Sequence, residues 1–166
     1  VIAAGGRYVA FTTSSTNAVL PDNNGTADVF VRDLGATAVA LAYGSPCLGT
    51  SPIPAQAEPI GQPFVGNAAF GVGVCNGFPS ALAVLALSVT PASTPVGSCI
   101  VALGGAVTLL GGGFTDIFGF ASTAVPIPAN PALVGFTLDA QYIVFDPNGQ
   151  FLGFAQLTQG LAITVN

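Results

Sequence analysis

The sequence predicts an all-β fold, an antiparallel β-sandwich (jelly-roll-like) with an N-terminal β arm or hairpin. Gly and Pro supply 22 and 13 of the 166 residues and recur at short intervals. Between them lie runs of five to eight residues rich in Val, Ile, Leu, Phe and Thr, which is typical of short strands joined by turns. No stretch sustains the helical apolar period of about 3.6 residues, so few helices are expected.

Three strands are expected in the N-terminal part. Arg7–Thr13 and Ala27–Leu34 contain the apolar runs YVAF and VFV, and Ala36–Ala42 is a run of Ala, Thr, Val and Leu. Residues 1–42 hold both arginines and three of the seven acidic residues, whereas the rest is Pro/Gly-rich and nearly uncharged. We therefore expect an N-terminal β segment over residues 1–42 and a sandwich domain over residues 43–166.

Five strands are expected in the middle of the chain, where Gly, Pro and Ser separate the apolar runs. Ser80–Ser88 has the composition of a helix, but its short length and the flanking Pro79 and Pro91 favour a strand. The expected strands are Phe64–Val74, Ala81–Val89, Ser98–Leu103, Ala106–Leu110 and Gly113–Thr123.

Four more strands are expected at the C-terminal end. Residues 147–149 (Pro-Asn-Gly) are a hairpin-turn signal, and we interpret residues 158–160 (Thr-Gln-Gly) as a second turn. The expected strands are Ala132–Asp139, Ala140–Asp146, Gln150–Thr158 and Leu161–Val165.

The charged residues exclude several classes of function. The chain has no His or Lys, and its basic residues are Arg7 and Arg32, which with seven acidic residues give a formal net charge of −5. Two arginines cannot form a phosphate-binding face, so we expect no nucleic-acid partner. A Ser–His triad, a Cys–His pair and a Schiff-base lysine are all impossible, so we expect no enzyme and no catalytic residues. Asp139 and Asp146 are the carboxylates that a hairpin could bring together, and we interpret them as strand-end and turn residues.

The chain is unusually apolar, with 51% hydrophobic and 5% charged residues and a mean hydropathy of +0.74. Its longest apolar stretch, Cys99–Phe114, contains five glycines and is shorter than the roughly 20 residues of a spanning helix, so no membrane span is expected. We expect neighbouring subunits or glycans to cover this surface. The chain begins VIAAGGRYVAF, without Met or a signal-peptide pattern, as a mature or trimmed chain would.

The three cysteines indicate an oxidising, extracellular compartment. Cys47 and Cys99 both lie in turns at the edges of strand-like runs, GSPC and VGSC, so we predict a disulfide between them. Cys75 is then a buried free thiol in an apolar strand. A disulfide that includes Cys75 is the alternative.

The N-terminal segment carries a motif of known type. GRYVAFTTSSTNAVLPDNNGTADVFVRDL, within residues 5–40, resembles the WD-like β-propeller repeat of secreted bacterial proteins. The resemblance implies β structure, but a propeller needs about four to eight blades and this chain holds at most one. The segment is therefore expected to pack on the second domain or to be completed by another chain.

The remainder, from about Tyr43, is similar to a C-terminal domain of large secreted proteins from planctomycete-like bacteria. The motifs that carry this similarity are YGSPCLG, PIGQPFVGNAAFGVGV, GSCIVAL and PALVGFTLDAQYIVFDPNG. The resemblance implies a secreted protein and a sandwich-like fold, but no activity.

The loop between the first two expected strands is a candidate calcium site. Asp22, Asn24 and Asp28 place oxygen ligands around a glycine, a pattern that suits Ca²⁺, although such loops are also ordinary turns. We expect no other cofactor.

Two kinds of glycosylation site are also present. Asn24 begins an N-glycosylation sequon, Asn24-Gly25-Thr26. Ser/Thr-rich stretches are candidates for O-glycans. Their candidate residues are Thr13, Ser14, Ser15, Thr16 and Thr94.

The leading hypothesis from the sequence is a structural subunit of an extracellular, pilus-like filament. Head-to-tail β-strand addition would join the subunits, with the arm Val1–Thr13 completing a neighbour's sheet. The candidate contact residues of this arm are Ile2, Arg7, Val9 and Phe11. The partner is then the chain itself, with glycans or other cell-surface material as further partners. The alternative is a monomeric adhesive or carbohydrate-binding module of a larger secreted protein.

Overall fold

The computed structural model describes residues 8–13, 26, 28–33 and 39–166. The chain divides into two compact units, Val1–Thr37 and Ala38–Asn166. The sequence placed this boundary after residue 42. It falls earlier because β3 (Val39–Tyr43) forms a ladder with β13 (Gly160–Thr164) of the second unit.

The described part of the first unit is an antiparallel pair of strands. β1 (Tyr8–Thr13) pairs with β2 (Asp28–Asp33) along its full length, from Tyr8 opposite Asp33 to Thr13 opposite Asp28. Both strands were predicted from the sequence. Phe11 and Val29 of this pair are 43% and 73% exposed. A two-stranded sheet with exposed apolar side chains has little stability of its own in water.

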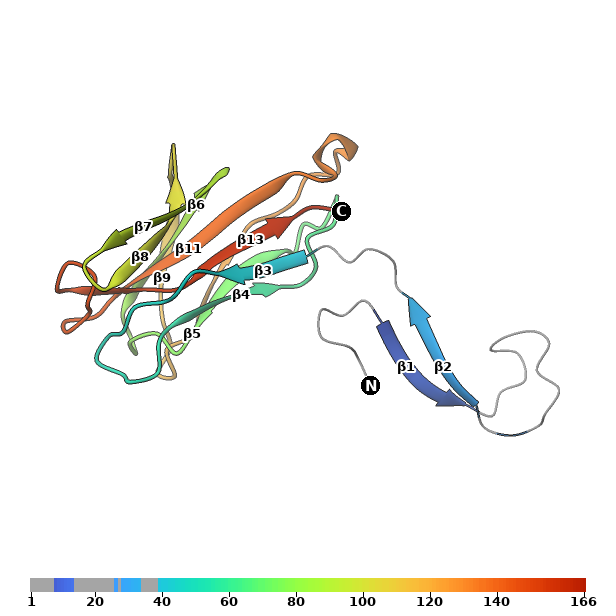
Figure 1. The fold of residues 1–166 in the computed structure, drawn as a ribbon, viewed down its shortest axis with the longest axis horizontal. Helices are drawn as coiled ribbons and strands as arrows, with labels where there is room; N and C mark the ends of the chain where they lie inside the picture. Colours follow the sequence, from blue (N-terminus) through green and yellow to red (C-terminus); the bar gives the residue numbers. More distant parts are fainter. Residues whose placement is uncertain (1–7, 14–25, 27, 34–38) are drawn as a thin grey trace. The chain divides into compact units, whose positions relative to one another are not determined.

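The second unit is a sandwich of antiparallel sheets, which confirms the predicted fold class (Figure 1). Its larger sheet has the order β3-β13-β11-β6-β9, with β12 also paired to β11. The strands not yet defined are β6 (Leu82–Ser88), β9 (Thr108–Phe114), β11 (Thr137–Phe145) and β12 (Ala155–Leu157). The smaller sheet has the order β10-β5-β4, formed by β4 (Gln56–Ile60), β5 (Gly71–Cys75) and β10 (Ala121–Ala124).

The main core lies between these two sheets. Alternate residues of β11 face it, as the period-two geometry of a strand requires, and Tyr142 among them is fully buried. The Tyr142 hydroxyl donates to the Val72 carbonyl oxygen at 2.8 Å and lies 2.7 Å from the Thr123 hydroxyl. A residue of the larger sheet is thereby bonded to both β5 and β10 of the smaller one.

A third layer covers the opposite face of the larger sheet. β7 (Thr90–Val96) and β8 (Cys99–Gly104) form a hairpin, labelled in Figure 1. The buried Gln141 of β11 accepts from the Ala102 amide at 3.0 Å and donates to the Ile100 carbonyl at 2.9 Å. Both partners belong to β8, so this one side chain bonds the hairpin to the sheet.

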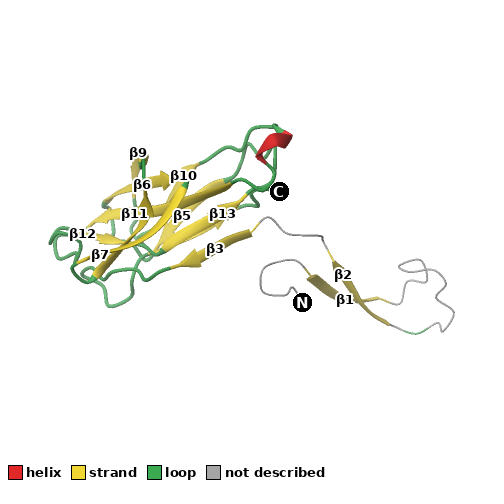
Figure 2. Ribbon diagram, turned by 45° about the horizontal axis from the view of Figure 1, so that its top comes forward, coloured by secondary structure: helices red, strands yellow, loops and turns green. Residues whose placement is uncertain are grey.

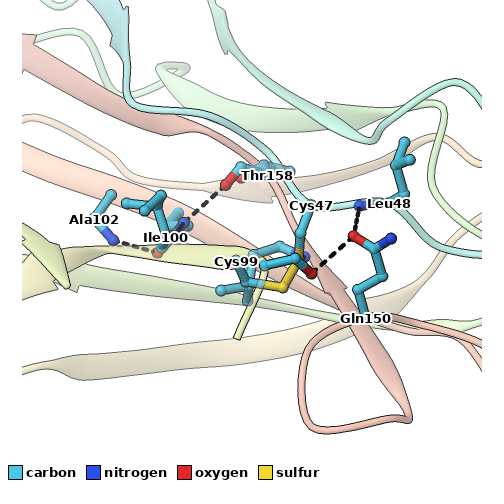
Figure 3. Close-up of a disulfide and its surroundings, with 10 residues drawn as sticks. Cys47, Leu48, Cys99, Ile100, Ala102, Gln150 and Thr158 are labelled. Atoms are coloured by element: carbon cyan, nitrogen blue, oxygen red, sulfur yellow. Dashed lines mark hydrogen bonds between the residues drawn. A yellow bond between two sulfur atoms is a disulfide. The ribbon is translucent and has the colours of Figure 1, made fainter. Parts of the chain in front are cut away.

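A disulfide also holds the hairpin in place. Cys47 and Cys99 are joined, as the sequence predicted, and their Cα atoms lie 4.9 Å apart (Figure 3). Both cysteines are buried with Leu157 in a second small core. Cys75 is free, but it is half-buried and not buried as expected.

Prolines account for two strands that the sequence did not predict. β4 contains Pro59, and β7 contains Pro91 and Pro95. β4 is an edge strand and β7 pairs with β8 alone, and such positions tolerate a residue that donates no amide hydrogen bond.

Several predicted boundaries were wrong. The two strands expected over 132–139 and 140–146 are the single strand β11, preceded by a 3-10 helix, η1 (Pro131–Leu133). The strand expected over 113–123 is interrupted, because the Asp116 carboxylate accepts the Phe118 and Phe120 amides and closes a turn.

The turn expected at residues 158–160 is a β-bulge. β12 and β13 both run antiparallel to β11, so the chain does not reverse direction between them. Leu157 is opposite Ile143 and Leu161 is opposite Ala140, which leaves one extra residue on the β12–β13 side. The Thr158 hydroxyl fills the gap by accepting the Tyr142 amide at 2.9 Å.

Removal of the disulfide should lower the free energy of unfolding. The bond links residues 52 apart in the sequence, and closing a loop of that length in the unfolded chain is worth about 4 kcal/mol. We expect the Cys47→Ser/Cys99→Ser variant to lose stability of this order in denaturant unfolding under oxidising conditions. Cys75→Ser is the control, and equal midpoints for the two variants would contradict the expectation.

Candidate assembly site on the larger sheet

The edge strands of the sandwich differ in how well they are protected against pairing with another chain. Exposed edges in natural proteins are blunted by prolines, charges, bulges or short length. β4 carries Glu58 and Pro59, and β10 has four residues and is followed by Pro126. β9 is bulged, since Gly111 and Gly112 together oppose one residue of β6. Each of these three edges has a protective feature.

β3 has none of these features. Its sequence is VALAY, and its five residues pair in unbroken register with β13, from Val39 opposite Thr164 to Tyr43 opposite Gly160. Within the described part of the chain, β13 is its one strand partner. The Leu41 side chain is 62% exposed. The outer edge of β3 is thus a regular, uncharged template for a further strand.

A groove of about 500 Å³ lies beside this edge, on the face of the sheet that also carries the β7–β8 hairpin. Residues of β3, β11 and β13 line it together with residues at the start of β7, and most of its lining is apolar. Its lining includes Leu41, Tyr43, Val89, Pro91 and Asp139. An exposed strand edge with an adjacent apolar groove is the arrangement by which β-strand addition recognises extended peptides.

Asp139 is the one charged residue of the groove lining and is 2% exposed. Burial raises the pKa of its carboxyl group, and the neighbouring Tyr43 side chain partly offsets this effect. Burial, together with Asp139, also raises the pKa of Tyr43. The Tyr43 hydroxyl donates to the Ala102 carbonyl at 2.7 Å, so it fixes the groove wall to the hairpin. The groove therefore combines apolar walls with a single buried carboxyl group.

Asp139 and Asp146 are not brought together. They lie seven residues apart on and just after one continuous strand, which separates them by roughly 23 Å. Both Asp146 carboxylate oxygens bond to Thr50, one to its amide and one to its hydroxyl, and Asp146 Oδ1 also accepts the Asn148 amide. Asp146 thus ties loops together, as the turn interpretation of the sequence indicated.

Most of the site residues predicted from the sequence belong to the first unit. Phe11 is part-exposed on β1, Val9 and Thr13 also lie on β1, and Asp28 begins β2 opposite Thr13. Thr94 is exposed on β7. The predicted residues outside the described part of the chain are Ile2, Arg7, Ser14, Ser15, Thr16, Asp22 and Asn24.

Sequence reasoning missed the groove, because its lining comes from four segments that are far apart in the sequence, around residues 41–43, 89–91, 137–139 and 162. The available signal was the run VALAY, which lacks any proline or charge. The described residues contain no cluster of three or more His, Cys, Asp or Glu side chains suited to a metal ion. Across the same residues, no helix is long and apolar enough to cross a membrane.

Comparisons with known proteins give no relative for this chain. No protein-family model matches it, and no curated protein or solved structure is significantly similar to it. The two resemblances drawn from sequence motifs therefore remain predictions.

The raised pKa of Asp139 gives a stability difference between the parent chain and a neutral variant whose size depends on pH. A carboxyl group with a folded-state pKa above its ordinary value of about 3.9 favours folding below that value, and this contribution is lost as the pH rises through the folded-state pKa. Asp139→Asn stays neutral, so it should melt at a higher temperature than the parent chain at pH 7 and show no such gain below about pH 4. Thermal unfolding followed by circular dichroism at both pH values measures this, and a lower melting temperature at pH 7 would contradict it.

Proposed function

We propose that the chain is a non-enzymatic structural subunit of an extracellular homopolymer, in which β-strand addition at the β3 edge joins one copy to the next. The observation that carries this proposal is the unprotected edge of β3 beside the apolar groove. Other edges of the same sandwich carry prolines, a charge or a bulge, so the bare edge is a property of β3 and not of the whole domain.

The donor in this proposal is the arm Val1–Thr13 of a neighbouring copy. Main-chain hydrogen bonds to the five residues of β3 supply directional strength, and alternate side chains of the arm enter the groove. Phe11, which is 43% exposed, is an apolar side chain of this arm. The donor and acceptor surfaces differ, so the contact is heterologous and can propagate along a filament.

Charge gives the proposed contact its register. The two cations of the chain, Arg7 and Arg32, are both in the first unit, whereas the groove holds the buried carboxyl group of Asp139. An arginine brought to Asp139 would favour its ionised form and compensate its burial. The disulfide supports the extracellular part of the proposal, because such bonds persist mainly outside the cytosol.

Leu41→Lys tests the acceptor edge. A lysine on an exposed edge strand opposes the addition of another strand, so long filaments should give way to monomers or short oligomers in negative-stain microscopy and sedimentation velocity. Leu109→Lys is a matched control, because Leu109 is also 62% exposed and lies on β9, the other edge strand of the sheet. Loss of filaments in the control alone would show that β9, and not β3, is the assembly edge. Filaments in both variants would refute strand addition at this sheet.

Deletion of residues 1–13 tests the donor. The truncated chain should form no filaments alone, but its intact β3 edge should still cap filaments of the full-length chain and shorten them. Microscopy of mixtures at increasing ratios measures the length. If the parent chain itself forms only discrete particles, the homopolymer is refuted and the monomeric binding module is favoured.

A further inference from the structure

The turn between β9 and β10 exposes two large apolar side chains. Ile117 and Phe118 are 73% and 79% exposed, and Phe118 is the most exposed large hydrophobic residue of the described chain. Loop tips are ordinarily polar, because they project into water. We name Ile117 and Phe118 the apolar knob.

The knob is held in a fixed conformation. Asp116 Oδ1 accepts the Phe118 amide at 2.8 Å and the Phe120 amide at 2.9 Å. Gly119 closes the turn with a φ of +77°, and a Cβ atom there would clash with the Gly77 carbonyl oxygen. The Gly77 amide in turn donates to the Gly119 carbonyl at 2.9 Å. A rigid apolar tip loses little conformational entropy when it binds.

An apolar pocket of about 220 Å³ opens elsewhere on the same unit. Its lining is entirely apolar and comes from the loop after β10, from η1 and from the ends of β11 and β13. Its main lining residues are Phe70, Val125, Ile127, Leu133, Phe136 and Leu138. A cavity of about 150 Å³ with a similar lining is large enough to bind benzene, so this pocket can admit a phenyl ring.

The knob and the pocket lie at opposite ends of the sandwich. The knob directly precedes β10 and the pocket lining begins directly after it, so β10 runs from one to the other. β5 runs the opposite way, with Phe70 before it in the pocket and Gly77 after it against the knob turn. Figure 2 shows η1, which borders the pocket, at the end of the sandwich where the C-terminus lies. One sandwich therefore cannot insert its own knob into its own pocket.

We propose that Phe118 of one copy, supported by Ile117, inserts into the apolar pocket of a second copy. The occupant is a second copy because the chain itself carries both halves of the contact, a fixed aromatic tip and an aromatic-sized apolar pocket, at opposite ends. A contact between different surfaces of identical chains does not close, so it aligns subunits head to tail. This contact uses none of the residues of the β3 groove and stands independently of strand addition.

The test is made in the full chain with Leu41→Lys, which removes strand addition and leaves the end-to-end contact to be measured by sedimentation. Phe118→Ser and Ile117→Ser should each weaken association, Phe118→Ser by about tenfold or more, which corresponds to about 1.4 kcal/mol or more. Ile53→Ser is the matched control, because Ile53 is also exposed, at 56%, but lies in a different loop. Equal association of Phe118→Ser and Ile53→Ser would overturn the proposal.

A mixing experiment tests the head-to-tail geometry. In the same Leu41→Lys chain, Leu133→Trp fills the pocket and leaves the knob intact, whereas Phe118→Ser removes the knob side chain and leaves the pocket intact, so each variant alone should remain monomeric. Their mixture retains one working contact and should give dimers and nothing longer. If circular dichroism shows that Leu133→Trp does not fold, Val125→Trp replaces it.

The outcomes separate this contact from strand addition. Absence of dimers in a mixture of folded variants would overturn the end-to-end contact and leave the test of β3 unaffected. Filaments that persist with Leu41→Lys but disappear when Phe118→Ser is added would support the end-to-end contact and refute strand addition.

Discussion

Strand β11 is the element on which the three layers of the sandwich depend. Its alternate side chains point to opposite faces of the sheet, and successive residues on it bond to different layers. Tyr142 bonds to β5 and β10 of the smaller sheet, whereas the adjacent Gln141 bonds to β8 of the hairpin. Both residues are buried, so loss of either would leave buried polar groups without partners, which is costly.

This arrangement explains how so apolar a chain folds into layers of short strands. The larger sheet is covered on one face by the smaller sheet and on the other, in part, by the hairpin, so its strands bury residues on both sides. On β6, for example, Ala83 and Leu85 face the main core, and Ala86 of the same strand is also buried. The apolar positions left exposed are concentrated at edges and turns, including Leu41 on β3 and Phe118 in the knob turn.

The two proposed contacts follow from different physical constraints. At β3 the constraint is backbone hydrogen bonding, because a strand edge presents amide and carbonyl groups that can pair with a further strand. At the knob and the pocket the constraint is the hydrophobic effect, because exposure of their apolar surface to water is unfavourable and a second copy can bury it. A subunit with one lateral and one end-to-end contact has the means to form an assembly stronger than either contact alone would give.

The sequence by itself determined the fold class, most strand positions and the Cys47–Cys99 bond. These depend on local signals: the spacing of Gly and Pro, short apolar runs, and cysteines placed in turns. Local signals gave a wrong prediction, or none, where contacts with other strands determine the structure. Pro91 was read as a flank of the strand before it and no strand was predicted over residues 90–96, yet a two-stranded sheet accommodates Pro91 and Pro95 there. Thr158 was read as part of a turn, yet its hydroxyl completes the ladder of β11.

The tertiary structure alone decided the groove, the pocket and their relation to the knob. The groove joins Leu41 to Asp139, and the pocket joins Phe70 to Leu133, residues that are distant in the chain. Their proximity is set by strand order and register, which depend on the free energy of the whole assembled core and not on the pattern of any one segment. For the same reason, the sequence could predict association through β structure only in general terms, whereas the folded sandwich distinguishes the bare β3 edge from the protected ones.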